Sequence, residues 1–99
     1  MATGAEEEHE IPGSTKLHGS YPNPFARTST IRFDLEEAAP VSLDIYDALG
    51  RSVTRLVDGW MPAGQHEAVF GAEDLTPGTY LARLVAGGQV FVHKMLVVR

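Results

Sequence analysis

The histidines are the first side chains to consider for catalysis or metal binding, and there are four of them: His9, His18, His66 and His93. No two have the His-x-x-x-His or His-Glu-x-x-His spacing that places zinc ligands on one face of a helix, and the chain has no cysteine. His66 and His93 fall on positions expected to face a core, where a hydrogen-bonded structural histidine is more common than a general base. The histidines therefore predict neither a metal site nor a catalytic base.

The acidic residues form no catalytic pattern either. The pairs Glu36-Glu37 and Glu73-Asp74 lie in expected turns, where carboxylates are normally solvated. The other candidates, Asp44, Asp47 and Asp58, lack the spacing of a calcium loop. The chain also lacks a Gly-x-Ser-x-Gly nucleophile motif and glycine-rich phosphate-binding motifs. We therefore predict that the protein is not an enzyme and uses no cofactor.

Aromatic side chains offer a different chemistry, the stacking of sugar rings. Trp60 follows Asp58-Gly59, which we expect to be a turn, and a loop tryptophan can stack on a sugar or cap the open end of a β-sandwich. Tyr21 and Tyr46 are the nearest companions, but no spacing forces the three rings into one flat platform. A carbohydrate-binding module is therefore an alternative interpretation.

The elements that position these residues belong to one small domain, because 99 residues leave room for only one. The formal net charge of −5 comes mainly from the first ten residues, since nine acids face eight bases from Thr15 onward. The basic residues are dispersed singly, without the basic stripe that neutralises phosphates. We therefore predict no nucleic-acid partner.

Residues 1–14 are predicted to be a flexible acidic linker, and residues 15–99 the folded domain. The linker carries Gly4, a run of glutamates and Pro12-Gly13-Ser14, with no apolar periodicity. Its acidic start is the reverse of a signal peptide, and the longest apolar runs are far shorter than the ~20 residues that cross a bilayer. If the chain is exported, we expect it to be the tail of a longer precursor.

Period-two alternation of apolar residues predicts short strands around residues 31–35, 41–46, 65–70 and 79–84. A further strand at 53–57 loses its alternation at Thr54-Arg55, which indicates a bulge, and the segment 89–98 is apolar on both parities. Turn signals separate them, including Asp47 to Gly50 and Asp58-Gly59, and no window has a helical period. The pattern predicts an all-β fold, an antiparallel β-sandwich of six or seven strands.

The Gly87-Gly88 pair predicts a two-residue hairpin loop that sets the register of the last two strands. One face of this hairpin is then a core face, with Tyr80, Ala82, Leu84, Phe91, His93, Met95 and Val97. The other face is also apolar, with Leu81, Val85, Val90, Val92, Leu96 and Val98 interrupted by Arg83 and Lys94. This outward stripe indicates either a docking or homodimer surface, or burial by an N-terminal segment or a register slip.

Several blocks of the sequence follow a recognisable order. They are Tyr21-Pro22-Asn23-Pro24-Phe25 with Thr28 to Leu35; Val41 to Val53, which includes Tyr46, Asp47 and Gly50; Leu56 to Gly59; Pro62 to His66, which includes Gly64; Leu75 to Leu84, which includes Pro77, Gly78 and Tyr80; and Lys94-Met95 with Arg99. In this order they resemble the C-terminal sorting domain of the type IX secretion system. The resemblance covers roughly Leu17 to Arg99.

The resemblance implies an Ig-like sandwich of about seven strands that ends a larger secreted protein, often a hydrolase such as a glycosidase or peptidase. Its partners would be that preceding cargo domain, the type IX secretion machinery and the outer-membrane surface of a Gram-negative bacterium. The residues matching the most C-terminal motifs, expected to serve recognition, are Pro77, Gly78, Tyr80, Lys94 and Arg99. The spacing from Lys94 to Arg99 is one residue longer than the Lys-x-x-x-Lys form of some members.

The other matched residues are expected to be mainly structural: Tyr21, Pro22, Asn23, Pro24, Phe25, Tyr46, Asp47, Gly50 and Gly64. Sorting and cell attachment is thus the main functional hypothesis. A carbohydrate-binding module and a structural or dimerisation spacer remain the alternatives.

Overall fold

The computed structural model describes residues 12–99, which form seven strands and no helix, and so no helix long and apolar enough to cross a membrane. Most of the predicted linker, residues 1–11, lies outside the described residues. The strands are β1 Lys16–Tyr21, β2 Thr28–Leu35, β3 Ala39–Asp47, β4 Ser52–Met61, β5 Gly64–Gly71, β6 Gly78–Ala86 and β7 Gln89–Val97.

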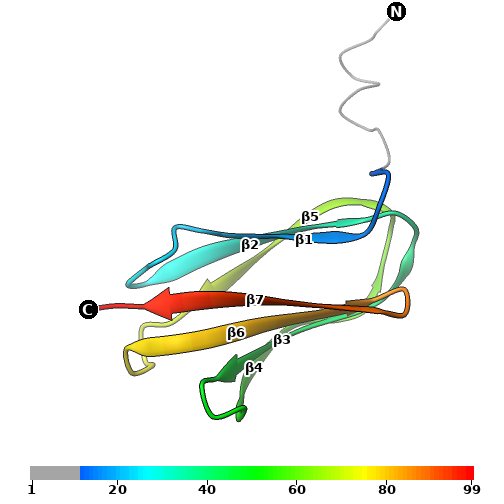
Figure 1. The fold of residues 1–99 in the computed structure, drawn as a ribbon. Helices are drawn as coiled ribbons and strands as arrows, with labels where there is room; N and C mark the ends of the chain where they lie inside the picture. Colours follow the sequence, from blue (N-terminus) through cyan, green and yellow to red (C-terminus); the bar gives the residue numbers. More distant parts are fainter. Residues whose placement is uncertain (1–11) are drawn as a thin grey trace, which may run out of the picture.

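Two antiparallel sheets pack face to face as a sandwich (Figure 1), as predicted. One sheet has the order β1-β2-β5 and the other the order β4-β3-β6-β7. Seven strands split between a three-stranded and a four-stranded sheet are typical of Ig-like sandwiches. Here β4 pairs with β3, so the fourth strand completes the sheet that contains β6 and β7.

The core lies between the sheets and follows the period-two alternation seen in the sequence. Ile31, Phe33 and Leu35 of β2 are fully buried and face Leu43 and Ile45 of β3 across the sandwich. Phe70 of β5 and Leu84, Met95 and Val97 of the last hairpin complete it. The burial of alternate residues in every layer is what holds the two sheets together.

The last hairpin has the predicted register. Ala86 pairs with Gln89, Leu84 with Phe91, Ala82 with His93 and Tyr80 with Met95. Gly87 and Gly88 both have positive φ, 59° and 77°, which a two-residue hairpin loop requires and which other residues rarely adopt. The register slip offered as one explanation of the outward stripe is therefore wrong.

Strand β4 differs from the sequence prediction. Asp58-Gly59 is not a turn, because β4 continues through it to Met61, and Trp60 lies in the strand opposite Pro40 rather than in a loop. The predicted bulge is present but lies at Leu56, which has no partner between Val57 and Arg55, and a second one leaves Val53 unpaired. With these two bulges β4 stays paired with β3 as far as Met61. The pairing therefore outweighs the turn preference of Asp58-Gly59.

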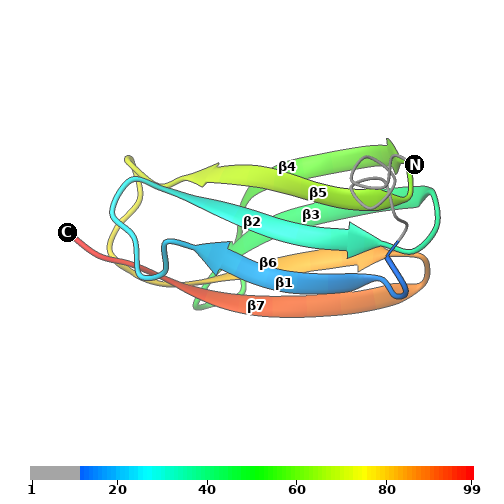
Figure 2. The same cartoon turned by 90° about the horizontal axis from the view of Figure 1, so that it is seen from above.

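The antiparallel order sorts the connections between two ends of the sandwich (Figure 2). Loops 36–38, 62–63 and 87–88 lie at the end where β1 begins. Loops 22–27, 48–51 and 72–77 lie at the end where β7 finishes, beside the carboxyl terminus. We call this second end the carboxyl-terminal pole.

Candidate functional site

Most of the motif residues singled out in the sequence lie at the carboxyl-terminal pole. The segment 21–25, the turn after Asp47, the turn leading to Tyr80 and Arg99 all lie there, whereas Gly64 begins β5 at the opposite end. Lys94 lies in β7, part-way along the strand.

The segment 21–25 fastens the pole to the edge of β7. The Asn23 side-chain amide bonds to β7 as the backbone of a neighbouring strand would: its Nδ2 donates to the Lys94 carbonyl at 3.1 Å and its Oδ1 accepts from the Leu96 N–H at 3.0 Å. We call this pair of bonds the Asn23 bracket. Phe25 then continues the pairing, since its N–H donates to Leu96 O and its carbonyl accepts from the Val98 N–H. The segment therefore covers the last part of the β7 edge.

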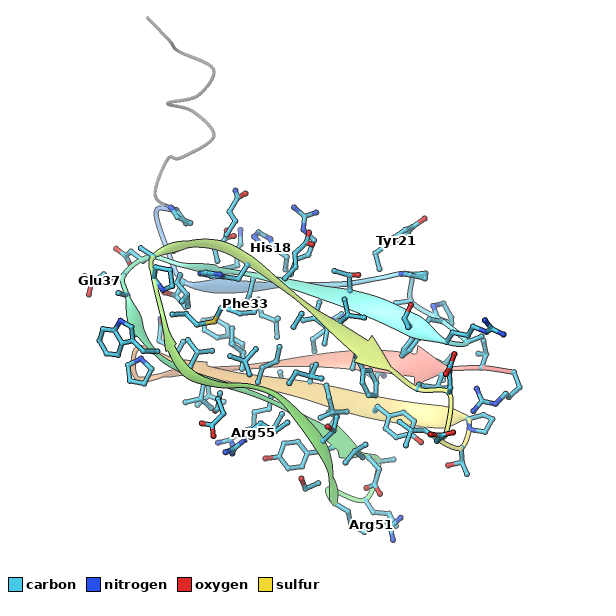
Figure 3. All side chains as sticks on the ribbon, turned by 180° about the vertical axis from the view of Figure 1, so that it is seen from behind. His18, Tyr21, Phe33, Glu37, Arg51 and Arg55 are labelled. Carbon is cyan, nitrogen blue, oxygen red and sulfur yellow. The ribbon has the colours of Figure 1, made fainter. Side chains whose placement is uncertain are left out.

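The residues around Asn23 divide between core and solvent. Phe25 is buried and its ring meets that of Phe70 edge-on at 5.7 Å. The buried Ser29 hydroxyl donates to the Pro22 carbonyl at 2.7 Å, which ties the segment to β2. Tyr21 is 79% exposed and points away from the sandwich (Figure 3), so this motif anchors through Asn23 and Phe25.

Arg99 lies in a cage of backbone carbonyls. Its guanidinium donates to Ala26 O at 3.2 Å, Glu73 O at 3.3 Å and Ala72 O at 3.4 Å, and also to Leu75 O. The planar guanidinium has five N–H donors, enough to serve several carbonyls at once. Arg99 thus ties the carboxyl terminus to the β5–β6 turn and to the loop before β2.

Tyr80 fastens the same turn from inside the sandwich. Its side chain is buried at 5% exposure, and its hydroxyl donates to the Thr76 carbonyl four residues upstream at 2.6 Å. This is the tyrosine corner of Ig-like sandwiches, in which a tyrosine at the start of the sixth strand bonds back to the preceding turn. Pro77 is exposed, and β6 begins at the next residue, Gly78.

Asp47 organises the neighbouring β3–β4 turn. Its Oδ1 accepts from the N–H groups of Leu49 and Arg51, both at 2.9 Å, and its Oδ2 accepts from Arg51 Nε at 2.8 Å. The backbone N–H of Arg51 is the main cause that holds the pKa of Asp47 below its ordinary value of 3.8. Gly50 has a φ of 85°, as the turn prediction required.

The two turns enclose an open hollow of about 420 Å3. Asp47, Leu49 and Arg51 line one side, and Leu75, Pro77 and Tyr80 are among the residues that line the other. Leu49 is 78% exposed at the rim, and Arg51 projects from the β3–β4 turn (Figure 3). Two motif blocks that are distant in the sequence therefore form one concave surface.

Lys94 and Arg99 do not form one cationic site. Lys94 is exposed on the outer face of β7, whereas Arg99 lies beyond the strand and turns back to the carbonyl cage. Tyr46 is half-buried on the outer face of β3, paired with Leu81 rather than placed at the pole hollow. Of the five residues predicted for recognition, Pro77, Gly78, Tyr80 and Arg99 converge on one turn and Lys94 lies apart.

Among residues 12–99, no three His, Asp or Glu side chains are arranged to hold a metal ion. His66 and His93 are half-buried and hydrogen-bonded, to Pro62 O at 2.8 Å and to Ser20 Oγ at 3.0 Å. Burial lowers the pKa of His93 below its ordinary 6.5.

The three aromatic candidates for sugar binding lie apart. Trp60 is 69% exposed at the end of β4 near the opposite end of the sandwich, and Tyr46 lies at the other end of the paired strand β3. Tyr21 belongs to the other sheet. These rings therefore form no common platform, and carbohydrate binding stays a prediction without structural support.

The family comparison matches residues 20–98 to the secretion-system C-terminal sorting domain. The chain belongs to this family. The match begins at the segment that brackets β7 and includes both turns of the carboxyl-terminal pole. No curated protein matches the chain. The sorting domain is a type IX secretion signal, which implies that it interacts with the secretion machinery and that its protein is secreted or displayed on the cell surface.

Sequence reasoning missed several of the sorting domain's side-chain contacts. The Asn23 bracket and the Arg99 cage join residues between 24 and 73 positions apart, and no local pattern indicates such pairs. Asp44 is also buried, and Arg55 covers it, with Nε donating to Oδ1 at 2.7 Å. The only signal for this ion pair was the bulge in β4, which shifts Arg55 into register with Asp44.

Proposed function

We propose that this sorting domain ends a larger secreted protein, a hydrolase such as a glycosidase or peptidase, and directs both its type IX secretion and its attachment to the outer-membrane surface. The family match supports the sorting role. The hydrolase cargo and the cell attachment rest on the family resemblance described above. The domain acts as a folded recognition module and contributes no catalytic group.

We propose further that the machinery recognises the carboxyl-terminal pole. The observation that carries this is the convergence of Pro77, Gly78, Tyr80 and Arg99 on the single β5–β6 turn. Tyr80 is buried, so it is a positioning residue, and Arg99 holds the turn from outside. Pro77 and the adjoining hollow supply the accessible surface that a partner contacts.

The direction of the chain fits this arrangement. β1 begins at the end of the sandwich opposite the carboxyl-terminal pole (Figure 1). In this proposal the cargo is joined on the side of β1, so the described chain enters the sandwich at the end opposite the turns that a partner contacts. Lys94, on the side of the sandwich, is proposed as a separate contact.

The proposal is tested by fusing the whole chain to a reporter that carries a signal peptide, in a host with type IX secretion. The surface fraction of the reporter is measured for the unchanged chain, Arg99→Ala, Lys94→Ala and Lys16→Ala. Lys16 is the matched control for Lys94, because it is an exposed strand lysine in the other sheet.

We expect surface display with the unchanged chain and with Lys16→Ala, and a loss with Arg99→Ala and Lys94→Ala. Circular dichroism must show that each purified variant is folded at the growth temperature, since a misfolded domain would be lost for another reason. A reporter that stays in the periplasm with the unchanged chain would contradict the sorting proposal itself. Equal display of all four would contradict the assignment of residues only.

A further inference from the structure

The open edge of β7 is left without a strand partner along part of its length. β7 ends the order β4-β3-β6-β7, so β6 is its one neighbour in that sheet. The two-residue loop makes Ala86 and Gln89 a hydrogen-bonded pair, and such pairs alternate along an antiparallel ladder. The odd-numbered residues of β7 therefore bond to β6, and the even-numbered residues direct their N–H and C=O groups toward the open side.

The contacts of the leading segment agree with this alternation. Asn23 and Phe25 bond to Lys94 O, to Leu96 N and O, and to Val98 N, all of them groups of even-numbered residues. This bracket begins only at the Lys94 carbonyl. The N–H and C=O groups of Val90 and Val92, and the N–H of Lys94, face the same side before the bracket starts, and no strand of residues 12–99 pairs with them.

The side chains at these positions form the outward apolar stripe. Val90 and Val92 are 54% and 60% exposed, and Leu96 and Val98 are also exposed. The charged side chains within the stripe are both cations, Lys94 and Arg83, the latter paired with Val92 across the ladder. Unpaired backbone groups thus lie directly beside an apolar, weakly cationic surface.

We propose that the Val90–Lys94 edge of β7 is a strand-addition site for an extended segment of the secretion machinery. Unpaired backbone donors and acceptors on an edge strand select an extended peptide, which can satisfy them in sequence. Alternate β-branched or other apolar side chains of that segment would continue the stripe beside Val90 and Val92. An acidic side chain would suit the position next to Lys94. The identity of the partner rests on the proposed function, whereas the open edge of β7 follows from the strand order alone.

A second copy of this chain fits the edge less well. Antiparallel pairing about Val92 would set Lys94 of each copy against Val90 of the other, which matches an ammonium group to an apolar side chain. The four exposed aliphatic side chains offer roughly 300 Å2, well below the about 800 Å2 that each partner of a stable complex buries. A single added strand gains its affinity from backbone hydrogen bonds instead, so it needs less area.

The test compares Val92→Pro with Val92→Thr in the reporter fusion that carries the whole chain. Proline removes the Val92 N–H, which faces the open side, and leaves the ladder to β6 intact, so an edge strand tolerates it. Threonine keeps the N–H and the β-branch but makes the stripe less apolar. We expect the surface fraction to fall about tenfold for Val92→Pro, since one bond is lost and a partner carbonyl is left unpaired, and to change less than about twofold for Val92→Thr.

A second measurement uses the unchanged chain, so it does not depend on the folding of a variant. The purified chain is mixed with detergent-solubilised outer membranes of the host, and amide hydrogen exchange is followed in the peptide that contains residues 89–95. We expect slower exchange of the Val90, Val92 and Lys94 amides than in detergent alone.

The outcomes separate this inference from the sorting proposal. If the unchanged chain does not reach the surface, the sorting proposal fails. If it does, normal display of a folded Val92→Pro, or unchanged exchange of residues 89–95, overturns the strand-addition site. An equal loss with Val92→Thr would assign the effect to the side-chain stripe and overturn it too. Light scattering that detects a dimer lost in Val92→Pro would make a second copy the occupant.

Discussion

His93 shows how one residue of this sandwich couples stability to pH. Its ring is half-buried between the sheets beside Ser20, and burial lowers its pKa below 6.5. The unfolded chain therefore binds the proton more readily than the folded one, so protonation favours unfolding. The stabilising effect of neutral His93 is complete above the unfolded pKa of 6.5 and is lost as the pH falls below it.

We expect the thermal unfolding midpoint of the parent to fall between pH 7 and pH 5 more steeply than that of His93→Gln. Glutamine can keep a hydrogen bond to Ser20 but does not titrate. The measurement is thermal unfolding by circular dichroism at several pH values. Parallel pH profiles for the two proteins would show that His93 does not contribute.

Tyr80 combines a buried ring with a hydroxyl that donates to the Thr76 carbonyl and also lies 3.3 Å from Thr76 Oγ1. Tyr80→Phe keeps the ring and removes these contacts, so we expect the free energy of unfolding to fall by about 1–2 kcal/mol. Urea unfolding measures it. Tyr21→Phe is the matched control, because Tyr21 is 79% exposed, and we expect it to change stability by less than about 0.5 kcal/mol. A neutral Tyr80→Phe would mean that the corner is held by packing alone.

At the scale of the element, the edge of β7 is held by a side chain that imitates a strand. Asn23→Ala removes both bonds of the bracket, to Lys94 O and Leu96 N, while Phe25 stays paired with Leu96 and Val98. We expect a loss of about 1–2 kcal/mol and faster amide exchange at Leu96 than in the parent. The Val98 amide, which bonds to Phe25, serves as the internal reference. Equal acceleration at both amides would indicate that the whole segment has detached.

For the whole molecule, the proposed function assigns the cargo junction to one end of the sandwich and recognition to the other. If the pole at the end of β7 is the recognised surface, the protein joined before β1 should matter little. We expect two folded reporters of different size, fused before the chain, to reach the surface in fractions that agree within about twofold, as independent domains joined by a linker should. Surface labelling of intact cells measures this. A surface fraction that differs strongly between the two reporters would indicate that the machinery also contacts the cargo.

Much of the fold follows from local pattern. Alternation in β2, β3, β5 and β6 set the inner face, and Gly87-Gly88 set the register of the last hairpin, because strand period and loop length act over a few residues. The turn predicted at Asp58-Gly59 was wrong, because pairing along the whole of β3 outweighs a local turn preference. The preference of two residues for a turn is small compared with the hydrogen bonds of a whole strand ladder.

The strand alternation and the turn residues were sufficient to predict a small all-β domain, and the ordered motif blocks indicated the sorting family. The folded chain was needed to show that Asn23 bonds to the edge of β7, that Arg99 donates to a cluster of backbone carbonyls, and that the Asp47 and Tyr80 turns share one hollow. These contacts depend on which loops the antiparallel order brings to the same end. The side chains there bond to backbone groups, which every residue type carries, so the sequence does not indicate which residue each side chain contacts.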